Sequence, residues 1–123
     1  RPGLAVLLVE DDADVRAVVR GYLLALGCRV TAVANAEQAL LALDGGTACE
    51  LLLTDVALGA GMRGTALAEA ARARRPGLPV LLMSGYSSEL LAADRGALPD
   101  AELLRKPYTR EELAQAIGRL TAR

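Results

Sequence analysis

Histidine is absent from this chain of 123 residues, as are tryptophan and phenylalanine, and cysteine occurs only twice. With no histidine and two cysteines, the chain cannot assemble a zinc cluster, and it offers no Ser-His or Cys-His pair for covalent catalysis. Cys28 and Cys49 lie too far apart in the sequence for a CxxC redox motif. Two free thiols in a reducing compartment are therefore predicted, and a disulfide is the less favoured alternative.

An excess of positive charge is also missing, because 14 basic residues face 15 acidic ones and the net charge is -1. Such a chain has no cationic surface for a nucleic-acid backbone, so no nucleic acid is expected as a partner. The apolar runs are short and no signal-peptide pattern opens the sequence, which predicts a cytoplasmic location without membrane contact. The first residue, Arg1, predicts a segment of a longer protein.

Length and composition predict one folded domain over residues 1–123. A chain of 123 residues is long enough for one hydrophobic core and too short for two. Its 53% hydrophobic and 24% charged residues are typical of a globular protein rather than a disordered one. The sequence shows no internal repeat, linker or low-complexity segment.

Five apolar runs predict five strands. They are LAVLLV at 4–9, CRVTAV at 28–33, ELLLT at 50–54, LPVLLM at 78–83 and AELL at 101–104. All but the second are almost continuously apolar, which predicts strands covered on both faces, as in a parallel sheet. The second run is the most polar and is predicted to lie at an edge.

Amphipathic stretches between these runs carry start and stop signals of helices. The predicted starts are Asp12 or Ala13, Asn35 with Gln38, Thr65, Ser87 or Ser88, and Thr109 with Glu112. The predicted stops are Gly27, Gly45, Pro76-Gly77 and Gly96. Alternating strands and helices with right-handed crossovers give a (βα)5 chain, a doubly wound three-layer α/β sandwich.

Polar residues follow four of the five strands, at the edge where open parallel sheets bind ligands. They are Glu10, Asp11 and Asp12 after the first strand, Asp55 after the third, Ser84 after the fourth and Lys106 after the fifth. Converging carboxylates repel one another, and one lysine neutralises only one of them. A hard divalent cation such as Mg²⁺ is the natural counterion, and Asp55 is then the candidate nucleophile toward a phosphoryl group.

Each of these residues also has a purely structural interpretation. Asp12 is a good helix cap, and helix starts favour acidic pairs in general. Ser84-Gly85 forms a turn sequence, and Lys106-Pro107 fits a loop before a capped helix. The functional interpretation is favoured because an acid pair, a lone aspartate, a hydroxyl and a lysine each end a different strand on the same edge of the sheet.

The combination of VEDD, TD, MSG and KP after successive strands resembles the response-regulator receiver family over essentially the whole chain. The segments DVALGAGMRG, MSGY and LLRKPYTREEL are most similar to receiver modules of hybrid sensor histidine kinases. The resemblance implies a flavodoxin-like fold with a five-stranded sheet of order 2-1-3-4-5.

The resemblance also implies a role for each residue of the acidic constellation. Asp55 would be phosphorylated, and Asp11 and Asp55 would bind Mg²⁺ directly. Glu10 would act through water, and the main-chain carbonyl of Ala57 would be a further ligand.

On the remaining strands, the resemblance makes Ser84 the hydroxyl that moves onto the phosphoryl group and Lys106 its ionic partner. The Lys106-Pro107 peptide bond would be cis, which is rare enough to be a test. Ala57 and Tyr86 would set the lifetime of the acyl phosphate.

Two departures from the family pattern affect the loop after the phosphorylation site and the expected switch, respectively. Gly59 or Ala60 stands where proline is usual, and Leu103 replaces an aromatic residue expected three positions before the lysine. Rotation of an aromatic ring at 103 therefore cannot transmit the signal in this chain.

Because the chain has no histidine, a partner must supply the phosphohistidine: a histidine kinase or a histidine phosphotransfer domain. Beyond its own phosphorylation and dephosphorylation, the domain is not expected to turn over a substrate. Phosphorylation is expected to change the surface of the fourth helix, fifth strand and fifth helix, through which a homodimer is one expected outcome.

Three alternatives are weighed against this interpretation. A degenerate receiver would serve only as a protein-binding scaffold. A haloacid-dehalogenase-type phosphohydrolase would use Asp12-Ala13-Asp14 as its DxD motif, although that spacing places Asp14 inside the first helix. A flavodoxin-like nucleotide binder is disfavoured because EDDAD would repel phosphate.

Overall fold

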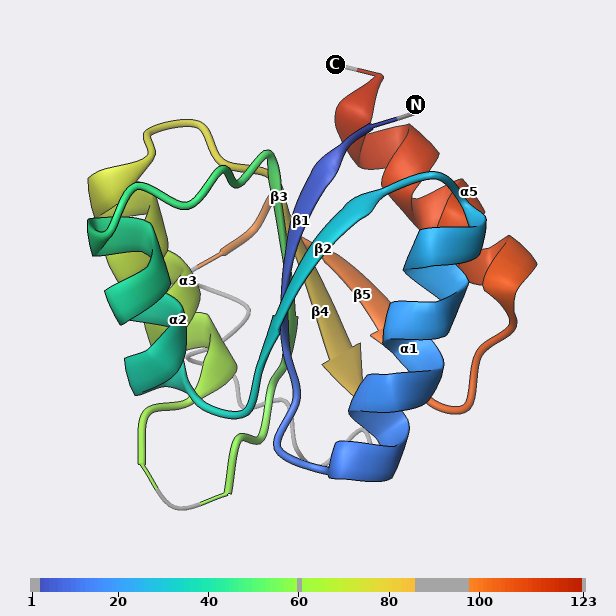
Figure 1. Cartoon of the computed structure of the whole chain (residues 1–123), viewed down its shortest axis with the longest axis horizontal. Helices are drawn as coiled ribbons and strands as arrows, with labels where there is room; N and C mark the ends of the chain where they lie inside the picture. Colours follow the sequence, from blue (N-terminus) through green and yellow to red (C-terminus); the bar gives the residue numbers. More distant parts are fainter. Residues whose placement is uncertain (1–2, 60, 86–97, 123) are drawn as a thin grey trace.

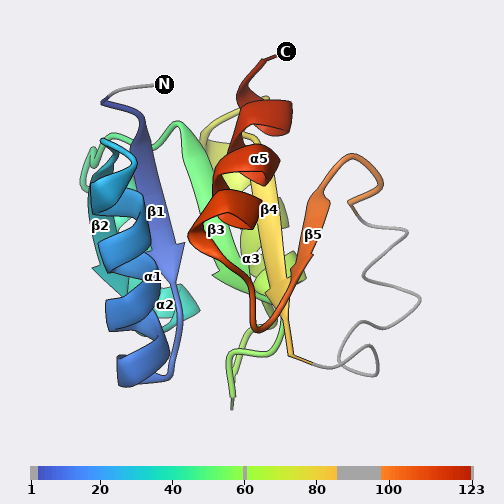
Figure 2. The ribbon, with the colours of Figure 1, turned by 90° about the vertical axis from the view of Figure 1, so that its right-hand side faces the viewer.

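A parallel five-stranded sheet forms the centre of the chain, in a computed structural model that describes residues 3–59, 61–85 and 98–122. The strands are β1 (Ala5–Val9), β2 (Arg29–Val33), β3 (Leu51–Asp55), β4 (Val80–Ser84) and β5 (Glu102–Arg105). Their order is β2-β1-β3-β4-β5 and every neighbouring pair is parallel, as predicted. Figure 2 shows this order across the sheet, with α1 and α5 in front of it.

Helices cover both faces of the sheet and make the predicted three layers. They are α1 (Ala13–Ala25), α2 (Ala36–Asp44), α3 (Gly64–Arg74) and α5 (Arg110–Thr121). In Figure 1, α1 and α5 lie on one face and α2 and α3 on the other. The helix predicted between Ser87 or Ser88 and Gly96 lies outside the described residues.

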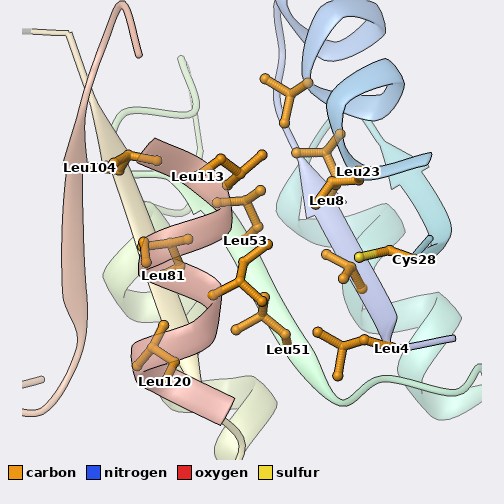
Figure 3. Close-up of a cluster of buried hydrophobic side chains, with 14 of the residues drawn as sticks. Leu4, Leu8, Leu23, Cys28, Leu51, Leu53, Leu81, Leu104, Leu113 and Leu120 are labelled. Atoms are coloured by element: carbon orange, nitrogen blue, oxygen red, sulfur yellow. The ribbon is translucent and has the colours of Figure 1, made fainter. Parts of the chain in front are cut away.

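Alternate residues of the central strands feed two apolar cores, one on each face of the sheet. Leu51 and Leu53 pack with α1 and α5, whereas Leu52, between them, packs with α2 and α3. Figure 3 shows the first core, in which Leu23 and Leu113 from the two helices meet the strand leucines. Fully burying each such leucine contributes about 2 kcal/mol, so this pattern is what holds the strand ends in place.

The two edge strands differ from the central ones in burial. β1, β3 and β4 are buried along their whole length, and β2 is partly exposed at one edge, as predicted. The prediction that the AELL run is covered on both faces is wrong. β5 is the opposite edge strand, and of its four residues only Leu104 is buried.

Most helix starts follow the predicted caps. Asp12 caps α1, Asn35 caps α2 by accepting from the Gln38 amide, and Thr109 forms a capping box with Glu112. The prediction that Thr65 caps the third helix is wrong, because α3 begins at Gly64 and its N-cap is Arg63, two residues before Thr65. The cause is Gly64, whose amide donates to the carbonyl of Val56 at 2.9 Å and so starts the helix close against the end of β3.

Two further findings concern the cysteines and the helices. Cys28 and Cys49 were predicted to be buried free thiols; both are free, but only Cys28 is buried and Cys49 is partly exposed. Within the part of the chain that the structure describes, none of the helices has the length and apolar character needed to span a bilayer.

Candidate functional site

The site lies where β1 and β3 end side by side. These strands are parallel neighbours in which Val9 pairs with Thr54. The residues that come next along the chain, Glu10 and Asp55, therefore lie together at the same edge of the sheet. Asp55 is the last residue of β3 rather than the first residue after it. Both acids are buried, with 1% of Glu10 and 4% of Asp55 exposed.

Lys106 joins these two acids from the far side of the sheet. It follows β5, and its Nζ lies 2.6 Å from Asp55 Oδ2 and 2.7 Å from Glu10 Oε1. One ammonium group therefore bridges two buried carboxylates. Both contacts are charge-assisted hydrogen bonds between partly desolvated groups. The sequence prediction that residues 10, 55 and 106 converge agrees with this geometry.

Burial and charge shift the ionisation of this trio. Burial raises the pKa of Glu10 to about 7, because desolvation outweighs the hydrogen bond from Lys106, which acts in the opposite direction. For Lys106, burial lowers the pKa, but the hydrogen bonds to Asp55 and Glu10 outweigh it and raise the pKa above its ordinary value. The lysine therefore remains a cation, while Glu10 can take up a proton near neutral pH.

Three carboxylates are placed to share a cation. One oxygen each from Glu10, Asp11 and Asp55 lie within 4.8 Å of one another. This set of hard oxygen ligands fits Mg²⁺, which is usually held by one or two carboxylates together with waters. The Ala57 amide donates to Asp55 Oδ1 at 3.1 Å, so Ala57 also lies at this edge, where its carbonyl was predicted to act.

The end of β4 connects the acids to the lysine. Ser84 is the last residue of β4 and is buried, and Met83 beside it pairs with Asp55 in the sheet. The Lys106 amide donates to the Ser84 carbonyl at 2.8 Å. The predicted cis bond between Lys106 and Pro107 is confirmed. Ser84 and Lys106 are thus held at the same edge as Asp55 by main-chain contacts.

Asp12 has the structural role rather than a place among the acids. Its Oδ1 accepts from the amides of Asp14 at 2.9 Å and Val15 at 3.1 Å, which caps α1. The turn before it is fixed by Arg16, whose Nη1 donates to the Glu10 carbonyl at 2.7 Å. Sequence reasoning missed Arg16, since nothing in the pattern of α1 shows which carbonyl its side chain reaches.

Two glycines of the β3–α3 connection make close approaches that the sequence did not predict, and Gly59 was noted there only as a departure from the family's proline. A Cβ on Gly64 would overlap the Asp55 carbonyl oxygen and lie 2.9 Å from the carbonyl carbon. A Cβ on Gly59 would lie 3.2 Å from Asp11 Oδ2. The only sequence signal was the presence of glycine, which does not reveal what each position faces. Tyr86, the other residue predicted to affect the acyl phosphate, lies outside the described residues.

The fold is that of a doubly wound α/β protein, and the carboxyl ends of its strands carry a carboxylate-rich site that is bridged by one lysine. Comparison with known proteins gives the family: the chain belongs to the response regulator receiver domain family, whose model matches residues 6–118. Receiver domains act in two-component systems, where they take a phosphoryl group from histidine kinases and generally bind Mg²⁺ at an acidic pocket.

Relatives of two lengths match this chain. It is 38% identical over 114 residues to the response regulator protein FleR of Pseudomonas aeruginosa, which covers 93% of the chain but 24% of FleR. It is 32% identical over 115 residues to the response regulator receiver protein CpdR of Brucella abortus, which covers 94% of both. The chain thus spans about a quarter of FleR and nearly all of CpdR.

Solved structures agree with this membership. A response regulator receiver protein from Sinorhizobium medicae WSM419 is 28% identical and superposes with a TM-score of 0.84, covering 96% of this chain and 94% of that one.

Proposed function

We propose that Asp55 of this receiver domain accepts a phosphoryl group from a phosphohistidine on a partner histidine kinase or histidine phosphotransfer domain. The observation that carries the proposal is the bridge from Lys106 Nζ to Asp55 Oδ2 at 2.6 Å and to Glu10 Oε1 at 2.7 Å. This bridge places a cation beside the carboxylate that would react. Glu10, Asp11 and Asp55, here called the acidic edge, carry more negative charge than one lysine neutralises. Because the chain has no histidine, the donor must come from elsewhere.

The acidic edge is proposed to hold Mg²⁺. Asp11 and Asp55 would bind the ion directly, Glu10 would act through water, and the Ala57 carbonyl would be a further ligand. When bound, the ion neutralises charge on the phosphoryl oxygens and on the carboxylates. The support for this proposal is the separation of the three carboxylate oxygens, all within 4.8 Å of one another.

The proposed reaction is an in-line displacement. A carboxylate oxygen of Asp55 bonds to phosphorus as the P–N bond of the phosphohistidine breaks, and the leaving imidazole nitrogen keeps the electron pair and takes up a proton. Lys106, already within 2.6 Å of Asp55, would pair with a phosphoryl oxygen. The Ser84 hydroxyl would donate a hydrogen bond to another oxygen of the acyl phosphate. This contact would favour the phosphorylated conformation of the domain over the unphosphorylated one.

A hollow beside the site offers contact surface for the donor protein. It has a volume of about 300 Å³ and lies between α1 and residues 106–108. Val15, Val18 and Tyr22 line one side and Tyr108 the other, and Val18 is 53% exposed. An apolar surface next to Lys106 fits the proposal that a helix bearing the phosphohistidine docks here.

The output of the switch is proposed to run without an aromatic ring at position 103. Leu103 lies on the edge strand β5 and is 39% exposed, so its side chain is accessible to a partner. A homodimer through the face of the predicted fourth helix, β5 and α5 remains a prediction. Light scattering with and without beryllofluoride and Mg²⁺ tests it, because a dimer should appear only with both present.

The wider context of the domain also remains proposed. We infer that residues 1–123 act as one cytoplasmic receiver domain, consistent with the two free cysteines. Similarity to receiver modules of hybrid sensor histidine kinases rests on the sequence segments alone, whereas the relatives compared above are named response regulators. The sequence of the full-length gene product decides between these parents.

The alternatives gain less support from the geometry. A dehalogenase-type hydrolase would need Asp12 as its nucleophile, but the Asp12 side chain accepts two amide bonds at the start of α1. A degenerate scaffold would not need the reactive residues to converge, and here Glu10, Asp55 and Lys106 do.

Incubation with acetyl phosphate and Mg²⁺ tests the proposal. Mass spectrometry should find one added phosphoryl group on the unmodified chain and none on Asp55→Asn. Asp12→Asn is the matched control, because asparagine is an equally good helix cap and labelling should persist. Equal labelling of Asp55→Asn and the unmodified chain would overturn the proposal, and labelling lost only in Asp12→Asn would favour the hydrolase.

A further inference from the structure

The loop between β3 and α3 contains two glycines with left-handed backbone that face different surroundings. Gly59 has φ +70 and Gly61 has φ +118. A Cβ on Gly59 would lie 3.2 Å from Asp11 Oδ2, whereas a Cβ on Gly61 would meet nothing within 4 Å. Both positions need glycine for their backbone conformation. Of the two, Gly59 alone lies against a carboxylate of the acidic edge, that of Asp11.

Asp11 is the carboxylate of this edge whose position is least constrained. Glu10 and Asp55 are buried, and both accept a hydrogen bond from Lys106 Nζ, at 2.7 Å for Glu10 and 2.6 Å for Asp55. Asp11 is exposed, although it lies close enough to share a cation with them. The Asp11 side chain interacts with that of Glu10, and its orientation also depends on the space around it, which Gly59 borders.

We propose that Gly59 is a positioning residue for Asp11: its missing side chain leaves room for the Asp11 carboxylate to turn onto the cation that it shares with Glu10 and Asp55. This inference rests on the proposed function, because it presumes that the edge binds Mg²⁺. A methyl group at position 59 would press on Asp11 Oδ2 in a contact tighter than van der Waals distance. The carboxylate would then rotate or shift, and a ligand held away from its ideal place weakens the site.

Gly59→Ala and Gly61→Ala form a matched pair for the test. Both place alanine at a positive φ in the same loop, so both should lower the melting temperature of the metal-free protein. Only Gly59→Ala touches Asp11, so only it should weaken Mg²⁺ binding measured by calorimetric titration, by about tenfold. Gly61→Ala should bind Mg²⁺ like the unmodified chain. Equal affinities for the two variants would overturn the inference.

A second pair shows whether the effect passes through Asp11. In an Asp11→Ala background the oxygen that Gly59 faces is gone, so adding Gly59→Ala should leave the weakened Mg²⁺ affinity unchanged. A further tenfold loss in the double variant would mean that the methyl group acts elsewhere in the loop, and the inference would fall. If Gly59→Ala does not fold, Gly59→Asn carries the same Cβ in a conformation that asparagine tolerates better. It should also bind Mg²⁺ more weakly than Gly61→Ala, and affinity equal to or tighter than that control would contradict the inference.

The outcomes separate this inference from the proposed function. An unmodified chain that binds no Mg²⁺ would contradict the proposed metal site and the role of Gly59 with it. An unmodified chain that binds Mg²⁺, alongside a Gly59→Ala variant that binds it equally well, would contradict only the role of Gly59.

Discussion

At the scale of single residues, the site combines two buried acids with one shared lysine. Lys106 pairs with both Glu10 and Asp55, yet burial leaves Glu10 with a pKa raised to about 7. A buried ion pair of this kind adds little net stability, because desolvation offsets the attraction between the charges. The arrangement is better explained by chemistry, since it keeps a cation beside the carboxylate that is proposed to react.

The raised pKa of Glu10 makes the metal-free protein sensitive to pH. Between its ordinary value of 4.5 and about 7, the folded state keeps a proton that the unfolded chain has lost. The free energy of unfolding should therefore fall as pH rises through this window, by about 3 kcal/mol from this group. Glu10→Gln should remove that fall, as measured by urea unfolding from pH 5 to 8 with chelator present.

The control for this prediction is Glu37→Gln, an exposed acid in the first turn of α2. The pH profile of Glu37→Gln should follow that of the unmodified chain, because Glu10 and its buried surroundings are the same in both proteins. If Glu10→Gln keeps the same pH profile as the unmodified chain, burial does not hold Glu10 protonated and the description of this trio is wrong.

At the scale of elements, the approach of α3 to β3 depends on one glycine. Gly64 begins α3, and a Cβ there would overlap the carbonyl oxygen of Asp55. Gly64→Ala should therefore lower the free energy of unfolding by about 1–3 kcal/mol, through overpacking against a main chain that cannot move aside. Urea unfolding of the metal-free protein measures the loss.

Gly118→Ala is the comparison for Gly64→Ala, because Gly118 is also helical but a Cβ there would meet nothing within 4 Å. That variant should gain up to about 1 kcal/mol, the difference in helix propensity between glycine and alanine. Similar effects of the two substitutions would show that contact with the end of β3 does not govern Gly64.

The sequence predicted elements well wherever local chemistry decides the outcome. Asp12, Asn35 and Thr109 cap helices as expected, because a cap is a short-range hydrogen bond between a side chain and nearby amides. Thr65 failed as a cap because the start of α3 is set by a tertiary contact of Gly64 with β3. The AELL strand failed for a related reason, since its exposure depends on its place at the edge of the sheet.

The candidate site was predictable as a set of residues but not as a geometry. The strand pattern placed Glu10, Asp55, Ser84 and Lys106 on one edge, because parallel strands end on the same side. It did not show that one lysine bridges two acids, or that Gly59 lies against Asp11. Such contacts join residues far apart in the chain, so only the packed structure reveals them.

At the scale of the whole molecule, the sheet order explains why the site exists. β1 and β3 are neighbours although β2 lies between them in the chain, so their acids meet at one edge. β4 separates β3 from β5, and the long side chain of Lys106 spans that distance from the far strand. Helices on both faces bury the strands, which leaves the carboxyl edge as the place where polar groups converge.

A crystal structure with Mg²⁺ and beryllofluoride tests the central claim most directly, because beryllofluoride mimics a phosphoryl group on a carboxylate. We expect beryllium bonded to an Asp55 carboxylate oxygen, Lys106 Nζ on a fluoride, and Mg²⁺ held by Asp11 and Asp55 together with the Ala57 carbonyl. Beryllofluoride bound elsewhere, or a metal ion away from these residues, would contradict the assignment of Asp55 as the phosphoryl acceptor beside a Mg²⁺ site.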